Sequence, residues 1–238
     1  MTAPFAIESQ DIRKTFGHFT ALAGVSLRIP RGEFVALFGR NGAGKTTFLK
    51  VAATLVRATH GKLAIESVDI REEPEKARRN IGFLSHNTYL YKELNPVENL
   101  RFFGRLYGTP DLEERIQSLL DRVGLQRRKL DPVRSFSRGL HQRLGLARVM
   151  LHDPSVILLD EPYTGLDANA VDMLNKILDE SAAAGKTIVL TTHDFDQGIR
   201  AATRAVIIDR GKVVVDTDAK DAQLREAYNQ YIRVGISR

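Results

Sequence analysis

The chain has no cysteine among its 238 residues. This excludes a disulfide framework and any metal site built from thiolates, and it is compatible with a reducing compartment. The chain also has no apolar run near the roughly 20 residues of a membrane-spanning helix, and we expect no signal segment at the N-terminus. A hydrophobic content of 43% is enough for a large core in a chain of this length. The sequence therefore predicts one folded unit without a membrane span.

Positive charge is only slightly in excess, with a formal net charge of +6. Many arginines nevertheless lie between residues 101 and 148, including Arg101, Arg105, Arg115, Arg122, Arg127, Arg128 and Arg134. They form either a solvated face or a field that attracts the protein to an anionic membrane leaflet. Nucleic-acid binding would be a third explanation, but no interleaved stacking aromatics or groove-reading module support it. We therefore expect no nucleic-acid partner.

A glycine-rich segment from Gly39 to Thr46 fits the pattern G-x-x-x-x-G-K-[ST]. The apolar residues 34–38 before it predict a buried strand, and residues 46–53 predict a helix whose positive end faces bound phosphates. Lys45 would reach the β- and γ-phosphates, and the Thr46 hydroxyl would bind Mg²⁺. An ordinary glycine-rich turn is the alternative. The predicted nucleotide-binding residues are Gly39, Arg40, Asn41, Gly42, Ala43, Gly44, Lys45, Thr46 and Thr47.

Two acids, Asp160 and Glu161, directly follow the apolar residues 156–159. Four consecutive apolar residues are typical of a parallel strand that is covered on both faces, and ligands of such sheets bind beyond the carboxyl ends of the strands. Asp160 would hold Mg²⁺, and Glu161 would activate an attacking water. The alternative is a solvated pair of acids at a strand end.

A third segment, Ser135–Arg143, gives the chain its resemblance to a known family. With the two motifs above, it resembles the ATP-binding subunits of ABC transporters, whose signature is L-S-G-G-Q. Here Ser137 and Gly139 are retained, while Phe136, Arg138 and Leu140 differ. The resemblance implies that Ser137 and Gly139 close on the γ-phosphate held by a second subunit, so they act in trans. Taken alone, the segment predicts a helix capped by Ser137.

Further matches extend the resemblance along nearly the whole chain. Asp167 ends a loop through which the two nucleotide sites of the family communicate, and it too would act in trans. His193 follows the apolar strand 187–190 and matches the histidine that contacts the γ-phosphate, so it is predicted to be catalytic with Glu161 and Lys45. Phe16 matches the aromatic residue that stacks on adenine; a core phenylalanine on an early strand is the alternative.

One match departs from the family. His86 stands where a glutamine usually contacts Mg²⁺ and senses the membrane partner, and Asn87 follows it. An imidazole or an amide can hydrogen-bond a metal-bound water, but neither copies the reach of glutamine. The prediction is a sensor at His86 or Asn87, with His86 as the candidate metal contact.

The order of motifs predicts an α/β fold: a P-loop NTPase nucleotide-binding domain of the ABC type, with a β-rich edge and a helical subdomain. We expect a single domain, 1–238, with residues 1–86 and 153–238 as catalytic core and residues 87–152 as helical subdomain. Within the latter, a helix from residue 96 should carry Leu100, Phe103, Leu106 and Tyr107 on one stripe. A last helix is predicted over residues 221–231.

The resemblance implies the ATPase subunit of a membrane exporter, with ATP and Mg²⁺ as cofactors. Two such subunits would form a homodimer at the cytoplasmic face of the cell membrane, peripheral to a separate transmembrane permease. Residues 83–103 resemble the ATPase of the haem exporter of cytochrome c maturation, which implies haem as substrate. Multidrug-type ABC exporters share much of this segment. A soluble ABC ATPase that acts on nucleic acid or ribosomes is an alternative of a different class.

Overall fold

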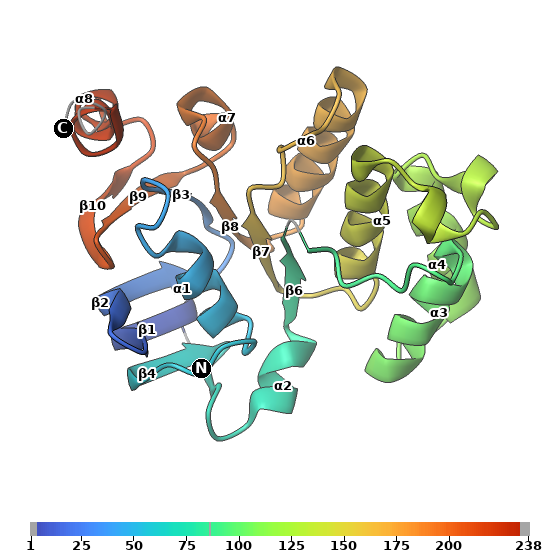
Figure 1. The fold of residues 1–238 in the computed structure, drawn as a ribbon, viewed down its shortest axis with the longest axis horizontal. Coiled ribbons are helices and arrows are strands. Elements are labelled where there is room, and N and C mark those ends of the chain that lie inside the picture. Colours follow the sequence, from blue (N-terminus) through green and yellow to red (C-terminus); the bar gives the residue numbers. More distant parts are fainter. Residues whose placement is uncertain (1–3, 86, 234–238) are drawn as a thin grey trace.

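The structure is a computed structural model and describes residues 4–85 and 87–233. Within these ranges, ten strands form two sheets, one with the order β2-β1-β4-β5 and one with the order β10-β9-β3-β8-β7-β6 (Figure 1). The strands are β1 (Phe5–Phe16), β2 (Phe19–Pro30), β3 (Phe34–Phe38), β4 (His60–Ile65), β5 (Val68–Asp69), β6 (Ile81–Leu84), β7 (Val156–Asp160), β8 (Thr187–Thr191), β9 (Arg204–Asp209) and β10 (Lys212–Asp218).

Helices separate groups of one to three strands at both ends of the chain and form an uninterrupted group in its middle. The α-helices are α1 (Lys45–Ala52), α2 (Pro74–Arg79), α3 (Pro96–Tyr107), α4 (Leu112–Arg122), α5 (Arg138–Met150), α6 (Ala168–Ala183), α7 (Phe195–Ile199) and α8 (Leu224–Tyr228). Short helical turns are η1 (Gln126–Arg128), η2 (Val133–Ser135) and the π-helical η3 (Asn229–Arg233). None of the helices in the described ranges is long and apolar enough to cross a membrane.

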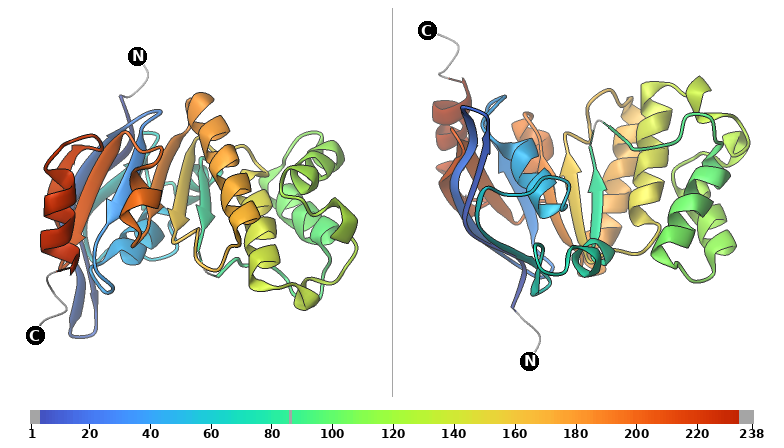
Figure 2. Two further views of the ribbon diagram at one scale, coloured as in Figure 1. Left: turned by 90° about the horizontal axis from the view of Figure 1, so that it is seen from above. Right: turned by 60° about the horizontal axis from the view of Figure 1, so that its bottom comes forward.

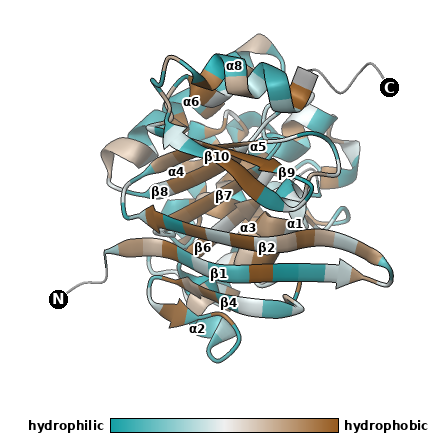
Figure 3. Cartoon of the chain, turned by 90° about the vertical axis from the view of Figure 1, so that its left-hand side faces the viewer, coloured by the Kyte–Doolittle hydropathy of each residue, from teal (hydrophilic) through white to brown (hydrophobic). Residues whose placement is uncertain are grey.

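The central strands of the six-stranded sheet are buried on both faces, and β3 shows how the sequence achieves this. Phe34, Ala36 and Phe38 pack into one hydrophobic core, while Val35 and Leu37 pack into the other. Successive strand residues point to opposite faces, so a strand covered on both sides must be apolar throughout. In Figure 3, β7, β8 and β9 are accordingly brown over most of their length, whereas hydropathy changes along β1.

The parallel pairings bring three strand ends to one edge. β8 lies between β3 and β7 and pairs in parallel with both, and β6 pairs in parallel with β7. Since β3, β7 and β8 run in the same direction, the segments that follow them emerge side by side. These segments are the glycine-rich loop, the pair of acids and the residues around His193.

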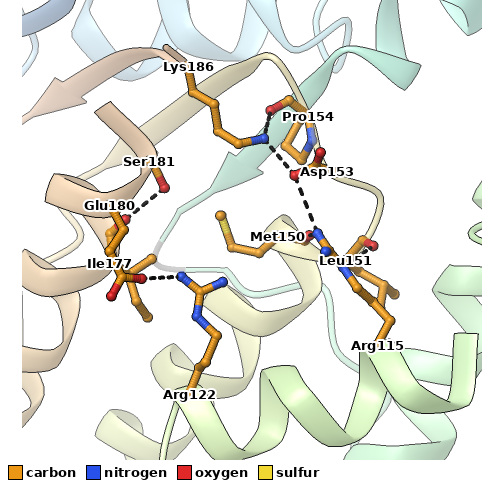
Figure 4. A network of polar contacts seen from close by, with 10 residues as sticks. All are labelled: Arg115, Arg122, Met150, Leu151, Asp153, Pro154, Ile177, Glu180, Ser181 and Lys186. Carbon is orange, nitrogen blue, oxygen red and sulfur yellow. Dashed lines mark hydrogen bonds and ion pairs between the residues drawn. The ribbon is translucent and has the colours of Figure 1, made fainter. Parts of the chain in front are cut away.

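The helical part lies at the end of the molecule opposite β1 and β2 (Figure 2). Arginines of α4 connect it to the core, as Figure 4 shows. Arg115 donates to the carbonyl of Met150 at 2.9 Å and contacts Asp153 at 3.4 Å. Arg122 contacts Glu180 on α6 at 2.6 Å.

Most of the arginines singled out in the sequence have an acidic partner. Besides Arg115 and Arg122, Arg101, Arg128 and Arg134 form ion pairs, with Glu113, Asp131 and Glu93 respectively. Their charges are therefore largely compensated within the protein, which favours the solvated face over a field that attracts the protein to a membrane.

Two local predictions are wrong. Leu106 is 71% exposed, because it lies well round the helix from the fully buried Leu100 and faces away from the core. The last helix is not continuous over residues 221–231: residues 224–228 are α-helical, and a π-helical turn follows at residues 229–233.

Candidate nucleotide-binding and catalytic site

The glycine-rich loop connects β3 to α1. Gly39 has φ 155° and Gly44 has φ 111°, a range that favours glycine. A Cβ at Gly39 would lie 2.4 Å from the carbonyl oxygen of Ile208, and one at Gly44 would lie 2.6 Å from that of Ala21. No side chain caps the start of α1, so its first N–H groups are available to phosphate oxygens.

Lys45 is the first residue of α1 and is nearly buried, with 6% exposure. Its ammonium donates to the carbonyl oxygens of Gly39 at 2.7 Å and Arg40 at 3.3 Å. Burial lowers the pKa of Lys45, while the charges of Glu161 and Asp160 oppose this shift. The ammonium of Lys45 therefore lies at the glycine-rich loop, bound to two carbonyl oxygens that phosphate oxygens can replace.

The carboxylate of Asp160 contacts two threonine hydroxyls next to the glycine-rich loop. Oδ1 of Asp160 accepts hydrogen bonds from the hydroxyls of Thr46 and Thr191, both at 2.9 Å. Hydroxyl and carboxylate oxygens suit Mg²⁺, which is usually held by one or two carboxylates together with water and substrate phosphates. Thr46 and Asp160 therefore fit the predicted ion.

Glu161 and His193 form a pair at the same edge of the sheet. Nδ1 of His193 lies 2.9 Å from Oε2 of Glu161. Glu161 has φ 53°, an uncommon conformation for a residue other than glycine. Tyr228 of α8 donates to the backbone oxygen of His193 at 2.5 Å. His193 is thus held through its backbone by Tyr228 and contacts the carboxylate of Glu161 through its ring, which gives the pair a defined orientation.

A cavity of 210 Å³ opens between the loop and the hairpin of β1 and β2. Its wall contains the predicted residues Arg40 to Thr47 and Glu161. It also contains Phe19, which sequence reasoning missed, in place of Phe16. Phe16 is half-exposed with the ammonium of Lys14 4.6 Å from its ring centre, and it pairs with Phe19 across the hairpin. Two aromatics around a Gly-His turn were the signal that could have found it.

The residues predicted to act in trans lie elsewhere. Ser137, Gly139 and Asp167 do not line this cavity. Ser137 accepts from the N–H of Leu140 at 3.4 Å and so caps α5, as its segment alone predicted. Asp167 caps α6 by accepting from the N–H of Ala170 at 2.8 Å.

His86, the residue that differs from the glutamine of the family, lies outside the described residues. Its neighbour Asn87 is described: its side-chain oxygen accepts from the N–H of Tyr89 at 3.3 Å, and its carbonyl accepts from the Ser85 hydroxyl at 2.9 Å. Asn87 does not line the cavity beside the loop. The sensor at this position stays a prediction.

Comparison with known proteins identifies the family of the chain. A family model described as ABC transporter matches residues 22–164. The ABC transporter ATP-binding protein NatA of Bacillus subtilis is 34% identical over 197 residues, 82% of this chain and 80% of that protein. The lantibiotic transport ATP-binding protein SrtF of Streptococcus pyogenes is 33% identical over 227 residues, 95% of this chain and 97% of that protein. The Nod factor export ATP-binding protein I of Cupriavidus pinatubonensis is 34% identical over 217 residues, 90% of this chain and 67% of that protein.

Solved structures are similar over most of the chain. An ATP-binding subunit of an ABC transporter superposes with a TM-score of 0.86 at 30% identity, covering 94% of both chains. The cassette MJ0796, in a dimeric post-hydrolysis state bound to ADP and Pi, has a TM-score of 0.83 at 26% identity and covers 90% of this chain and 99% of that one. The predicted likeness to a haem exporter ATPase receives no support from these relatives. The predicted fold is confirmed: the chain belongs to the ABC transporter family and is an ABC ATPase, the subunit of a translocase that binds and hydrolyses ATP.

Proposed function

We propose that this chain is the ATPase subunit of an ABC exporter that works as a homodimer, at the cytoplasmic face of a membrane, on a separate transmembrane permease. The observation that carries the catalytic part is the Glu161–His193 pair, 2.9 Å apart, at the sheet edge where Thr46 meets Asp160. The export part rests on relatives whose names refer to export of Nod factor, transport of a lantibiotic and resistance to daunorubicin. Haem is the narrower hypothesis, drawn from residues 83–103 alone.

The residues at the loop would bind and orient ATP. Lys45 exchanges the carbonyls of Gly39 and Arg40 for oxygens of the β- and γ-phosphates, and the uncapped N–H groups of α1 bind further phosphate oxygens. Thr46 and Asp160 would hold Mg²⁺, which would supply positive charge against the negative charge that develops on the phosphates. Phe19, Phe16 or both contact the base.

Glu161 would take a proton from the attacking water. Nδ1–H of His193 donates to Glu161, which orients the carboxylate and leaves Nε2 of a neutral ring as an acceptor. A hydrogen bond from Nε2 to a phosphate oxygen therefore requires a protonated ring or a rearranged Glu161–His193 contact. With a protonated ring, His193 would stabilise charge at the γ-phosphate through Nε2–H and position the base through Nδ1–H.

The second subunit would complete the site. Ser137, Gly139 and Asp167 lie outside the cavity of their own chain, and the related cassette MJ0796 is dimeric in two solved structures. The Ser137 hydroxyl, the N-terminus of α5 and the small Gly139 would approach the γ-phosphate that the partner binds. The cavity would then be closed by the partner's α5.

The variant Glu161→Gln tests the catalytic proposal. It keeps the size and polarity of the side chain but cannot accept the proton, so ATP should still bind while turnover falls at least ~10²-fold. ATP should also hold the variant as a dimer in size-exclusion chromatography. Exposed Glu72→Gln is the matched control and should turn over normally. Near-normal turnover of Glu161→Gln would remove Glu161 from the role.

The partner is tested by purification from detergent-solubilised membranes with the tagged chain as bait. A co-purifying polytopic subunit supports the exporter, and its identity defines the class of substrate, haem included. Co-purifying ribosomes or DNA would support the soluble ABC ATPase instead.

A further inference from the structure

Thr191, the last residue of β8, lies between the two acids of the catalytic site and is fully buried. Its hydroxyl donates to Oδ1 of Asp160 at 2.9 Å. The hydroxyl oxygen of Thr191 also accepts a hydrogen bond from the backbone N–H of Glu161 at 3.1 Å. The backbone carbonyl oxygen of Thr191 lies at the same distance from that N–H. One side chain therefore contacts both acids at once.

The two contacts use the two capacities of a hydroxyl. A threonine hydroxyl has one hydrogen and two lone pairs. Because its hydrogen is directed to Asp160, a lone pair is left for the N–H of Glu161. Valine has the same shape but can do neither, and it would leave a buried carboxylate with one donor fewer.

The contact between Thr191 and Glu161 lies at a residue with an uncommon backbone conformation. Glu161 has φ 53°, a conformation that the surrounding structure must hold in place for a residue with a side chain. Its N–H is bonded to the side chain and the backbone of Thr191, and its carboxylate reaches His193. The direction of the Glu161 carboxylate therefore depends on a backbone conformation that the two hydrogen bonds to Thr191 stabilise.

We propose that Thr191 is a positioning residue for ATP hydrolysis, which sets the orientation of Asp160 and Glu161 relative to each other. This inference rests on the proposed function of the site. Thr191 acts through the two acids, since its hydroxyl is bonded to Asp160 and to the backbone N–H of Glu161. Small displacements of a catalytic group have large effects on rate, of about 10²-fold for 1 Å, whereas ground-state binding at the loop depends on Lys45 and the backbone N–H groups.

The test compares Thr191→Val with Thr187→Val. Thr187 lies at the opposite end of the same strand, is equally buried, and its hydroxyl accepts the N–H of Gly32 at 2.9 Å. Both variants lose one buried, hydrogen-bonded hydroxyl, so both should lose similar stability in urea unfolding. Only Thr191→Val should lower kcat, by at least about tenfold, with the KM for ATP within about threefold of wild type. Thr191→Ser should recover at least half of the lost activity.

Other outcomes separate this inference from the proposed function. An equal loss of kcat in both valine variants, or a normal kcat in Thr191→Val, would overturn the positioning role, as would a serine variant as slow as valine. If Thr191→Val does not fold, Thr191→Ala takes its place with the same expected fall in kcat. If Glu161→Gln is slow while Thr191→Val is not, only the role of Thr191 fails; if Glu161→Gln itself turns over normally, the proposed base fails first.

Discussion

Acidification should destabilise this protein through His152, which lies between the end of α5 and the start of β7. Its ring stacks on Tyr107 with centroids 3.9 Å apart, and Nε2 lies 3.0 Å from the carbonyl oxygen of Ile81. Nδ1 is buried and has no hydrogen-bond partner within the described ranges. Burial lowers the pKa of His152 from 6.5 to about 4, and the nearby cations Arg148 and Lys186 add to the shift.

The sign and the size follow from linkage. Because the pKa is lower in the folded than in the unfolded state, the unfolded chain takes up a proton first as the pH falls below 6.5. Stability is thus fully present above pH 6.5 and is lost progressively down to about pH 4. At 1.36 kcal/mol per pKa unit, the complete loss is about 3 kcal/mol, of which about 2 kcal/mol is reached at pH 5.

Urea unfolding followed by circular dichroism at pH 7, 6 and 5 measures this loss. The variant His152→Phe keeps a ring against Tyr107 but cannot take up a proton. It should be less stable than wild type at pH 7, by about 1 kcal/mol for the lost hydrogen bond, and should lose about 2 kcal/mol less than wild type between pH 7 and pH 5. His18→Gln, in the exposed turn between β1 and β2, is the control. Parallel losses in wild type and His152→Phe would refute the reasoning.

Two further predictions concern the nucleotide site. Lys45→Ala should lose ATP affinity, because the ammonium contacts phosphates in the ground state as well as in the transition state; calorimetry with an unchanged affinity would contradict the assignment. A mixture of Lys45→Ala and Ser137→Arg subunits places both lesions in one composite site and leaves the other intact, so ATPase assays of the mixture should show activity that each variant lacks alone. No recovery in proven heterodimers, together with no crosslink between Ser137 and Gly42 of opposite chains, would contradict the trans arrangement.

Buried strands were the elements that local sequence predicted best. The apolar runs at residues 34–38, 156–159 and 187–190 coincide with β3, β7 and β8 to within one residue. A strand covered on both faces has no polar face, so its pattern is visible without knowledge of its neighbours. Leu106 shows the opposite case: an apolar residue on a helix contributes to the stripe only if another element covers that side, and none in the described structure buries it.

The chemistry proposed for the site was predicted from short segments, because phosphate binding needs small residues at fixed spacing and metal binding needs acids at a strand end. The contacts between those segments could not be predicted in this way. Thr46 and Asp160 meet across 114 residues, and Glu161 and His193 across 32. They meet because β8 is inserted between β3 and β7, a strand order that no local periodicity records.

The sequence alone thus determined which residues can bind phosphate, hold a metal ion or accept a proton, since these properties belong to side chains and to the backbone freedom of glycine. The tertiary structure decided which of them touch. It placed Thr191, an unremarked strand residue, against both acids, and Phe19 in the wall of the cavity where Phe16 was predicted. The physical reason is that direction and distance between segments depend on sheet order and core packing, which are properties of the whole chain.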